Sequence, residues 1–471
     1  FTPWNTQFHE LYSPFKAHTR YIKHLAESAN FKGGTLSKLC NGLIGNRFEM
    51  PNVSYTHPLY AIIGWHSCKQ SRSQMNRSKF KHSYILQPLV HRLSVFLFTI
   101  LLGVVPQVVK SQTLDYDQLR SMIDSLVNSD QFSGSIIVDL ASDTQFHYTA
   151  GYTNRNPNIP LNGSTRFEIA SLTKQFTAAL ILKLYEEGLL SLQDPFGKYL
   201  EWYPEEYKDQ VSIHHLLAHQ SGIPNYTHDG DWPELSTQDF AQEDFVAHFL
   251  KARPLEFDPG SDFLYSNSNY YLLGLIAEKI AEENYGDLIH KYFFKPLEMN
   301  NSGTLENRNE IKNLALGHEK LANGFVDKAP TQSYSTAFSV SGLYSTPDDL
   351  LRWSKALDSS MIFTDTTLNK MLTPYLADYG YGLLISNLDP DQLAGRLRDP
   401  FYINQYPNNT TIRCIWHWGA NPGYNTLFLK IPDQQITIVI LENLTHLAAE
   451  TPTLIPDLAQ NILTKMLTTK P

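Results

Sequence analysis

A serine and a lysine three residues apart are the strongest candidates for chemistry in this chain. Ser171 and Lys174 precede an apolar run at 176–182, which predicts a buried helix that ends near Gly188, a residue type favoured after helix C-termini. Residues at i and i+3 share a helix face, so the hydroxyl and the amine are expected side by side. Backbone N–H groups at a helix N-terminus favour negative charge. The pair therefore predicts a nucleophile beside a base.

The Ser-x-x-Lys spacing is a weak signal by itself. It recurs at Ser13 and Lys16 and again at Ser78 and Lys81, so two of the three occurrences are expected to be accidental. A turn before Ser171 and an apolar helical run after Lys174 give that pair a distinctive setting. Its functional interpretation depends on partners from elsewhere in the chain.

Three histidines form a second cluster of chemically able residues. His214, His215 and His219 have a spacing that metal ligands can use, but no carboxylate or cysteine nearby completes a ligand set. We therefore expect them to be structural. The chain also contains no GxGxxG, P-loop, HExxH or GxSxG motif, so dinucleotide, nucleotide and zincin chemistry lose their usual sequence support. We expect no metal and no organic cofactor.

Composition narrows the class of protein. A chain of 471 residues can form two or three domains with a large core. Its net charge of −9 and the lack of a basic stripe argue against non-specific nucleic-acid binding. Of its cysteines, Cys40 and Cys68 lie in an N-terminal region with no domain-like pattern, and we expect Cys414 to be a buried strand residue. With Cys40 and Cys68 set aside, the single remaining cysteine excludes a disulfide framework.

The N-terminal region differs in pattern from the rest of the chain. Residues 1–74 show no sustained period of 2 or 3.6, and we predict an upstream extension rather than a folded domain, with translation starting at Met75. A basic stretch after Met75 precedes the apolar run LSVFLFTILLGVV at 93–105, which predicts a secretory signal peptide over 75–111. That run is short for a membrane span. We expect an exported protein, periplasmic or extracellular; an uncleaved membrane anchor is the alternative.

The elements that must position Ser171 and Lys174 are strands at both ends of 112–471 and helices between them. Strands are expected at 132–140, 144–150, 380–385, 411–416, 425–431 and 435–442. Helices are expected at 116–127, 214–218, 245–251, 269–282, 286–294 and 454–467. This order predicts an α+β fold, an α/β sandwich in which helices flank an antiparallel sheet formed by both ends of the mature chain. We assign the α/β part to 112–190 and 333–471 and an inserted, mostly helical domain to 191–332.

Several stretches occur in an order that is typical of one enzyme superfamily. They are FEIASLTKQFTAA at 167–179, HHLLAHQSGIPNY at 214–226, FDPGSDFLYSNSNYYLLGLIAEKI at 257–280, SVSGLYSTPDDLLRW at 339–353 and HWGANPGY at 417–424. Together they resemble the serine β-lactamase and penicillin-binding protein superfamily, in its class C and DD-carboxypeptidase branch, which also includes esterases and D-amino-acid amidases. The resemblance extends from about residue 115 to 445 and implies a β-lactamase/transpeptidase-like fold.

The second motif of that superfamily, Tyr-x-Asn, matches Tyr265 and Asn267. The resemblance implies that Ser171 attacks a carbonyl to form an acyl-enzyme, and that Asn267 orients Lys174 and a substrate amide. A base must take the serine proton, and Lys174 and Tyr265 are both candidates, since either becomes a base at neutral pH only if its pKa is lowered. The sequence leaves the choice between them open.

The third motif, Lys-Thr-Gly or His-x-Gly on a sheet edge, matches His417 and Gly419, which Ala420 follows. The resemblance implies that these three residues bind substrate and that the backbone N–H groups of Ser171 and Ala420 form an oxyanion hole. His417 replaces the lysine usual in class C β-lactamases. An imidazole, whose charge depends on pH, holds a substrate carboxylate less firmly than an ammonium does.

These features predict a secreted serine hydrolase that acts on peptide, amide or ester substrates, with weak or absent β-lactam hydrolysis. We expect a small-molecule or peptide substrate, with peptidoglycan-derived fragments among the candidates, no nucleic-acid partner and no stable membrane span after signal cleavage. A catalytically silent relative that binds a peptide or peptidoglycan is the alternative. Retention of all the motif residues argues against it. The oligomeric state is not readable from the sequence.

Overall fold

The computed structural model of the chain describes residues 116–140, 145–203, 206–250, 253–324, 326–388, 393–398, 412–447 and 454–468. All of these residues belong to one compact unit. The predicted upstream extension (1–74) and the predicted signal peptide (75–111) lie outside the described residues.

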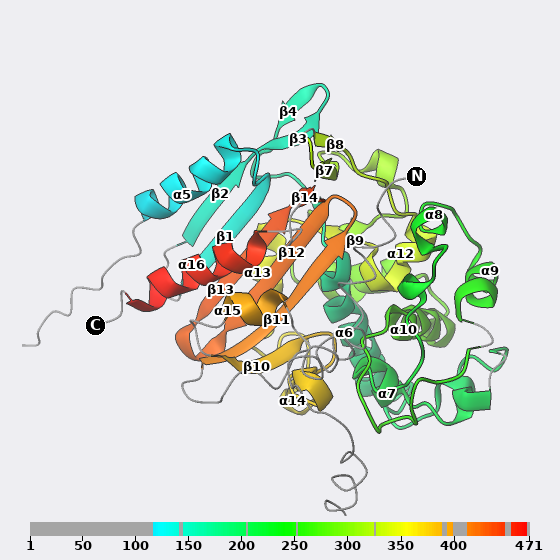
Figure 1. Cartoon of the computed structure of the whole chain (residues 1–471). Coiled ribbons are helices and arrows are strands. Elements are labelled where there is room, and N and C mark those ends of the chain that lie inside the picture. The colour runs from blue at the N-terminus through cyan, green and yellow to red at the C-terminus, as the bar shows by residue number, and fades with distance from the viewer. Residues whose placement is uncertain are drawn as a thin grey trace, which may run out of the picture. The chain divides into compact units, whose positions relative to one another are not determined.

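A six-stranded antiparallel sheet forms the centre of this unit (Figure 1). Its strand order, β10-β11-β12-β13-β1-β2, places the first described strand beside strands from the C-terminal part of the chain, and Gly134 pairs with Glu442. The predicted antiparallel sheet built from both chain ends is confirmed. Its strands are β1 (Gly134–Leu140), β2 (Gln145–Ala150), β10 (Leu384–Leu388), β11 (Ile412–Asn421), β12 (Tyr424–Ile431) and β13 (Ile436–Glu442).

Helices cover both faces of the sheet, which explains why β1 and β13 are nearly continuous apolar runs rather than alternating patterns. Consecutive residues of one strand face different cores: Ile137 belongs to the core around α6, whereas Ile136 and Val138 belong to the core on the opposite face. In Figure 1, the helices of that opposite face lie together on the near side of the sheet. They are α5 (Tyr116–Asn128), α15 (Leu393–Arg398) and α16 (Ile455–Thr468), while α6 (Thr173–Glu186) and α13 (Pro347–Ala356) pack on the other face.

The middle of the chain is mostly helical, as predicted, and also holds three short strands. Two of the predicted helices each continue into a π-helical turn, α9 (Gln242–Phe245) into Val246–Leu250 and α11 (Tyr285–Ile289) into His290–Phe294. The division of the chain into an α/β part and a helical insert stays a prediction. The other elements here are α7 (Ile213–Leu217), α8 (Trp232–Leu235), α10 (Asn267–Ala281), β6 (Gly303–Thr304), β7 (His318–Lys320) and β8 (Val326–Lys328).

Small sheets connect the middle of the chain to the segments on either side of it. One of them, β5-β9-β6, holds the strand that leads directly to Ser171, and the other is β14-β7-β8. A separate hairpin, β3-β4, lies before Ser171 in the chain. The remaining elements are β3 (Tyr152–Arg155), β4 (Asn158–Pro160), β5 (Phe167–Glu168), α12 (Tyr334–Ser341), β9 (Leu343–Ser345), α14 (Asp365–Met371) and β14 (Leu444–His446).

Two strands differ from the predicted boundaries by more than two residues. The strand expected at 380–385 is β10, which begins only at Leu384; Tyr379, Tyr381 and Leu383 are buried in the core from a loop, and their burial imitated a strand pattern. The strand expected to end at residue 416 is β11, which continues to Asn421 because a two-residue turn there lets it pair with β12 along its length. The extension carries the whole third motif on a strand.

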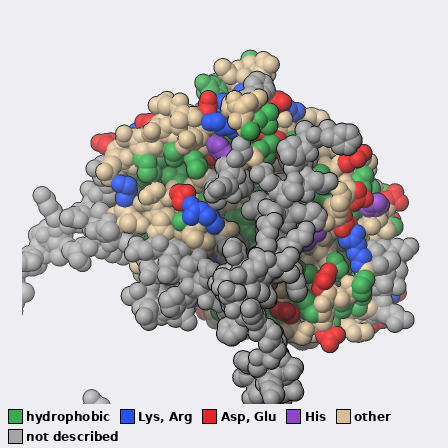
Figure 2. All heavy atoms as spheres, in the orientation of Figure 1, with side chains coloured by type: hydrophobic (Ala, Val, Ile, Leu, Met, Phe, Trp, Pro, Cys, Tyr) green, Lys and Arg blue, Asp and Glu red, His purple; other side chains and the backbone are tan. Residues whose placement is uncertain are grey.

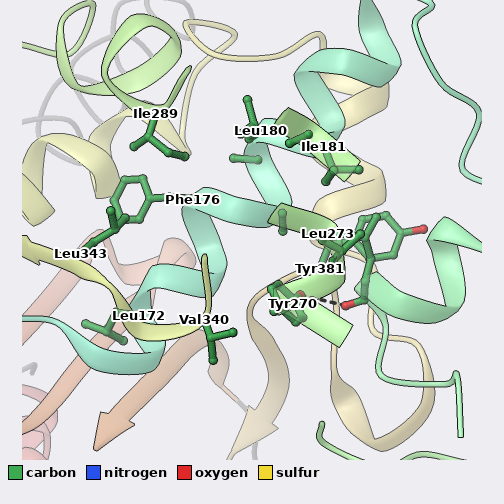
Figure 3. Packing of buried hydrophobic residues seen from close by; sticks show 14 of the residues in the cluster. Leu172, Phe176, Leu180, Ile181, Tyr270, Leu273, Ile289, Val340, Leu343 and Tyr381 are labelled. Carbon is green, nitrogen blue, oxygen red and sulfur yellow. Dashed lines mark hydrogen bonds between the residues drawn. The ribbon is translucent and has the colours of Figure 1, made fainter. Parts of the chain in front are cut away.

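The helix α6 is apolar on nearly all sides, which is the pattern of a helix inside a core. Figure 3 shows Phe176 with Leu343 and Ile289 around it. Its ring centroid lies 4.4 Å from that of Trp353. The helix ends at Glu186, and Gly188 follows with a φ of 74°, as the predicted C-terminal position requires. This packing fixes the axis of the helix that starts beside Ser171.

We expect the substitution Phe176→Ala to lower the free energy of unfolding by about 3–5 kcal/mol, because removing a fully buried ring leaves a cavity in the core. Urea unfolding followed by circular dichroism measures this loss. Leu189→Ala is the control, since that side chain is 49% exposed and its removal should change stability by less than about 0.5 kcal/mol. A loss of similar size in both variants contradicts the prediction.

Candidate active site

Ser171 lies on a tight turn between β5 and α6. Ala170, directly before it, has a φ of 46°, and a 3-10 turn over Ala170–Leu172 leads into the helix. The left-handed conformation costs an alanine on the order of 1–3 kcal/mol, so neighbouring contacts must hold it in place. Strain of this kind clusters at functional sites, and here it leaves Ser171 only partly buried at the start of a buried helix.

The side chain of Lys174 is completely buried and is surrounded by three oxygen atoms. Its Nζ lies 3.1 Å from Ser171 Oγ, 2.8 Å from Asn267 Oδ1 and 3.2 Å from the carbonyl oxygen of Val340. Burial lowers the pKa of this amine well below its ordinary value of 10.5, because the charged form loses its hydration. The structure thus brings together Ser171, Lys174 and Asn267 from two helices far apart in the sequence.

The loop that contains His219 holds the second motif in position. The backbone oxygen of His219 accepts the Leu264 N–H at 2.9 Å, and its Nδ1 accepts the Ser266 N–H at 3.2 Å. Asn225 Oδ1 accepts the N–H of Asn267 at 3.1 Å. These bonds pair the loop with the segment before α10, and they place Asn267 at the first position of that helix.

The ring of Tyr265 packs between the first and third motifs. Lys174 Nζ lies 5.0 Å from the ring centroid of Tyr265. The ring centroids of His219 and Trp418 lie 4.4 Å and 5.8 Å from it, and that of His417 lies 6.2 Å away. The three motifs predicted from the sequence therefore meet around the ring of Tyr265.

The strand β11 passes directly beside the Ser171 turn, and this approach requires glycine at position 419. A Cβ on Gly419 would lie 2.8 Å from the Ser171 nitrogen, 2.7 Å from the Ile169 oxygen and 2.5 Å from Thr426 Oγ1. Distances below 3 Å are too short for carbon beside these atoms, so any larger residue would push the strand away from the nucleophile.

The register of the β11–β12 hairpin decides where the N–H of Ala420 points. Asn421 and Tyr424 flank a two-residue turn, which makes them a hydrogen-bonded pair, and such pairs alternate along an antiparallel ladder. The N–H of Ala420 therefore points away from β12. On its other side, β11 pairs with β10, but only as far as Trp416. In the described part of the chain, the N–H of Ala420 thus faces a sheet edge that no strand covers.

His417 is completely buried, and both of its ring nitrogens are hydrogen-bonded within the protein. Its Nδ1 lies 2.5 Å from the backbone oxygen of Trp418, which can only accept, so Nδ1 carries the proton. Nε2 then accepts from the Tyr379 hydroxyl at 3.1 Å. Burial, together with the nearby Lys174, lowers the pKa of His417 to about 3.

The low pKa corrects one expectation from the sequence. His417 was expected to change its charge with pH, but in the structure the imidazole is neutral across the physiological range, because its charged form cannot be hydrated. Contact with a substrate further requires that Nε2 exchange the Tyr379 hydroxyl for a substrate group. Substrate binding by His417 stays a prediction.

The other two histidines of the 214–219 cluster make structural contacts. His215 completes a capping box with Ser212 at the start of α7, and His214 Nδ1 lies 2.8 Å from the Tyr381 hydroxyl. Among the described residues, no group of three or more His, Cys, Asp or Glu side chains is arranged to hold a metal ion.

Sequence reasoning missed the carbonyl of Val340, since a backbone acceptor has no signal in residue type. The helix α12 is interrupted at Phe338, where φ is 31° and ψ is −125°. Beyond the interruption, the Ser339 oxygen accepts from Thr177 Oγ1 at 2.6 Å and the Val340 oxygen accepts from Lys174. The strained residue therefore lies directly before the two carbonyls that contact α6.

An ion pair on the strand that leads to Ser171 was also missed. Glu168, at the end of β5, forms a salt bridge with Arg308. Asn421 Nδ2 donates to Glu168 Oε2 at 3.2 Å, and Arg308 donates to the Tyr424 hydroxyl at 3.0 Å. These contacts connect the strand before Ser171 to the β11–β12 hairpin. The glutamate lies inside a motif that the sequence identified, but its partners are distant in the chain.

Charged side chains of both signs are interspersed on the face of the molecule shown in Figure 2. Within the ranges that the structure describes, no helix combines the length and the apolar character needed to cross a bilayer.

The chain matches one protein-family model, and it is similar to curated proteins and to a solved structure. The family model described as Beta-lactamase matches residues 119–460. The chain is 27% identical to Penicillin-binding protein 4* of Bacillus subtilis, over 69% of this chain and 71% of the relative. It is 28% identical to Protein flp of Staphylococcus aureus, over 69% of this chain but only 63% of the relative. A solved penicillin-binding protein from Bacillus halodurans matches with a TM-score of 0.57 and 27% identity, covering 69% of this chain and 94% of that one.

We expect His417→Asn to change how stability depends on pH. The pKa of His417 is about 3 in the folded protein and about 6.5 in an unfolded chain, so its contribution to stability is complete above pH 6.5 and is lost as pH falls toward 3. Acidification from pH 6.5 to 5 should therefore lower the free energy of unfolding of the wild type by about 2 kcal/mol more than that of the variant, as measured by urea titration. His147→Asn, at an exposed position, is the control. Equal losses in His417→Asn and the wild type contradict the prediction.

Proposed function

The chain belongs to the beta-lactamase family of serine hydrolases, and on that premise we propose that it is an exported hydrolase that forms an acyl-enzyme at Ser171. Its substrates are peptides, amides or esters. The observation that carries the proposal is the buried amine of Lys174, held 3.1 Å from the Ser171 hydroxyl and within hydrogen-bonding distance of two further oxygens. A buried lysine beside a partly exposed serine is costly to maintain without a chemical use.

The proposed base is Lys174 rather than Tyr265. A neutral amine has two N–H groups and one lone pair, and Asn267 Oδ1 and the Val340 oxygen can only accept hydrogen bonds. Each of these oxygens takes one N–H group, and the lone pair is left for the hydroxyl proton of Ser171. The lowered pKa of Lys174 favours the neutral form that this role needs.

The reaction then follows from these contacts. Ser171 Oγ attacks the substrate carbonyl carbon while its proton moves to Lys174 Nζ, which gives a tetrahedral intermediate with a negative oxygen. That oxygen lies between the N–H groups of Ser171 and Ala420. The intermediate expels the leaving amine or alkoxide, which takes the proton back from Lys174. A water molecule then attacks the acyl-enzyme ester while Lys174 Nζ again accepts a proton. The bond between the acyl carbon and Ser171 Oγ breaks, Oγ takes that proton back from Lys174, and the acid product leaves.

The choice of substrate class rests on the third motif. A neutral His417 in place of an ammonium offers little attraction for a substrate carboxylate, so we propose acyl transfer from peptides, simple amides and esters, with weak or absent β-lactam hydrolysis. Asn267 Nδ2, which donates to Thr227 Oγ1 at 3.3 Å, keeps a second N–H group for a substrate carbonyl. Peptidoglycan-derived peptides are candidate natural substrates, and the leader pattern at 75–111 supports export.

We expect Ser171→Ala to abolish acylation. Wild-type protein incubated with a fluorescent penicillin, a D-Ala-D-Ala peptide and a p-nitrophenyl ester should gain an acyl mass from one or more of them, and the variant from none. Turnover of the best substrate should fall at least about 10³-fold. Ser129→Ala, at an exposed position, is the matched control and should behave as the wild type. A wild type that never acylates, beside a fully functional Ser171→Ala variant, favours the silent binding protein instead.

Two further variants test the identity of the base. The rate of acylation in the wild type should fall as pH drops through the lowered pKa of Lys174, because only the neutral amine accepts a proton. Lys174→Met should reduce kcat/KM by about 10²–10⁴-fold and remove this acidic limb, whereas Tyr265→Phe should retain it. Pre-steady-state acylation measured from pH 5 to 10 provides the profiles. The opposite pattern assigns the base to Tyr265.

A further inference from the structure

The two N–H groups proposed for the oxyanion hole come from segments about 250 residues apart in sequence, on a turn before α6 and on β11. Their separation decides whether both can donate to one oxygen, since each donor must lie within about 2.7–3.1 Å of it. Hydrogen bonding between β11 and β12 does not fix this separation, because the Ser171 turn belongs to neither strand. A contact between the sheet and that turn has to do so.

The side chain of Thr426 makes such a contact. It lies on β12 directly opposite Gly419, is 1% exposed, and its Oγ1 is 3.0 Å from the Ile169 oxygen. A carbonyl oxygen can only accept, so the Thr426 hydroxyl donates to it. The same hydroxyl lies 3.3 Å from the Gly419 oxygen. One buried side chain thus touches both the segment before Ser171 and the residue before Ala420.

Two further backbone hydrogen bonds hold Ile169. Its carbonyl also accepts the Leu172 N–H at 3.1 Å, which closes the 3-10 turn, and its N–H donates to the Leu343 oxygen at 3.0 Å. The strained Ala170 follows directly, so any rotation of the Ile169 peptide is passed on to the N–H of Ser171. The orientation of one donor of the oxyanion hole therefore depends on what the Ile169 carbonyl contacts.

We propose that Thr426 is a positioning residue that sets the separation of the Ser171 and Ala420 N–H groups, an inference that rests on the proposed function. It acts through the Ile169 carbonyl and touches no reacting atom. The contact of Asn421 with Glu168 lies further along the same hairpin and reinforces it. Loss of the Thr426 hydroxyl is not expected to unfold the protein, because the Ile169 carbonyl keeps its bond from Leu172.

Thr426→Val tests the proposal, since it keeps the shape of the side chain and replaces the hydroxyl by a methyl group. A methyl carbon needs about 3.3–3.6 Å from a carbonyl oxygen, so it also pushes the Ile169 carbonyl away from β12. We expect kcat to fall about tenfold with KM nearly unchanged, a fraction of the 10²–10³-fold that loss of a whole donor costs. The infrared band of the acyl-enzyme carbonyl should move to higher wavenumber because the carbonyl is less polarised.

Two other variants separate positioning from stability. Thr426→Ser retains the hydroxyl and should restore kcat to within about twofold of the wild type. Thr437→Val removes a similar buried hydroxyl from the neighbouring strand β13. This hydroxyl lies 2.8 Å from Ser354 Oγ of α13. Thr437 lies four residues, or roughly 13 Å, along β13 from Leu441, the residue paired with Thr426. It should reduce stability without moving kcat or the carbonyl band.

Crystal structures of the wild type and of Thr426→Val make the test independent of catalysis. The separation of the Ser171 and Ala420 nitrogens should increase by a few tenths of an ångström in the variant. An unchanged separation, with kcat and the carbonyl band as in Thr437→Val, overturns the positioning role even if the protein acylates. If the nitrogens are further apart in Thr426→Val but the wild type never acylates, the positioning role is supported and the proposed function is overturned instead.

Discussion

The burial of one lysine amine is the constraint on which the rest of the site depends. A charged ammonium loses several kcal/mol of hydration in a protein interior, so Lys174 must either find strong acceptors or lose its proton. The structure supplies oxygens from a turn, from the first residue of α10 and from the backbone beyond the kink in α12. Because each comes from a different part of the chain, the position of the amine fixes the relative placement of three elements.

Two of the segments that approach this amine contain a strained residue. Ala170 and Phe338 both have positive φ, and each precedes atoms that contact Lys174. The kinked α12 can approach because α10 carries glycine at 274, where a Cβ would lie 2.1 Å from Ser339 Oγ. Such conformations persist only where the surroundings over-determine them. Here the apolar packing of α6 provides those surroundings, since the core holds the helix that carries Lys174.

Much of the fold was predictable because its signals are local. Apolar runs in β1 and β13, the buried helix after Ser171 and the turn residues before it indicate secondary structure without reference to distant residues. The boundary of β10 was wrong because Tyr381 and Leu383 are buried from a loop, and burial alone does not distinguish a strand from a loop. The extent of β11 was also missed, since it depends on pairing with β12.

The sequence by itself determined the candidate nucleophile and the order of the three motifs, because residue types and their spacing are written in the chain. Only the tertiary structure decided which oxygens surround Lys174, that His417 is neutral and that Thr426 reaches the Ile169 carbonyl. Each of these depends on distances between segments far apart in sequence and on how much water the packed atoms exclude. Desolvation and hydrogen-bond geometry are properties of the assembled fold, and no single stretch of sequence carries them.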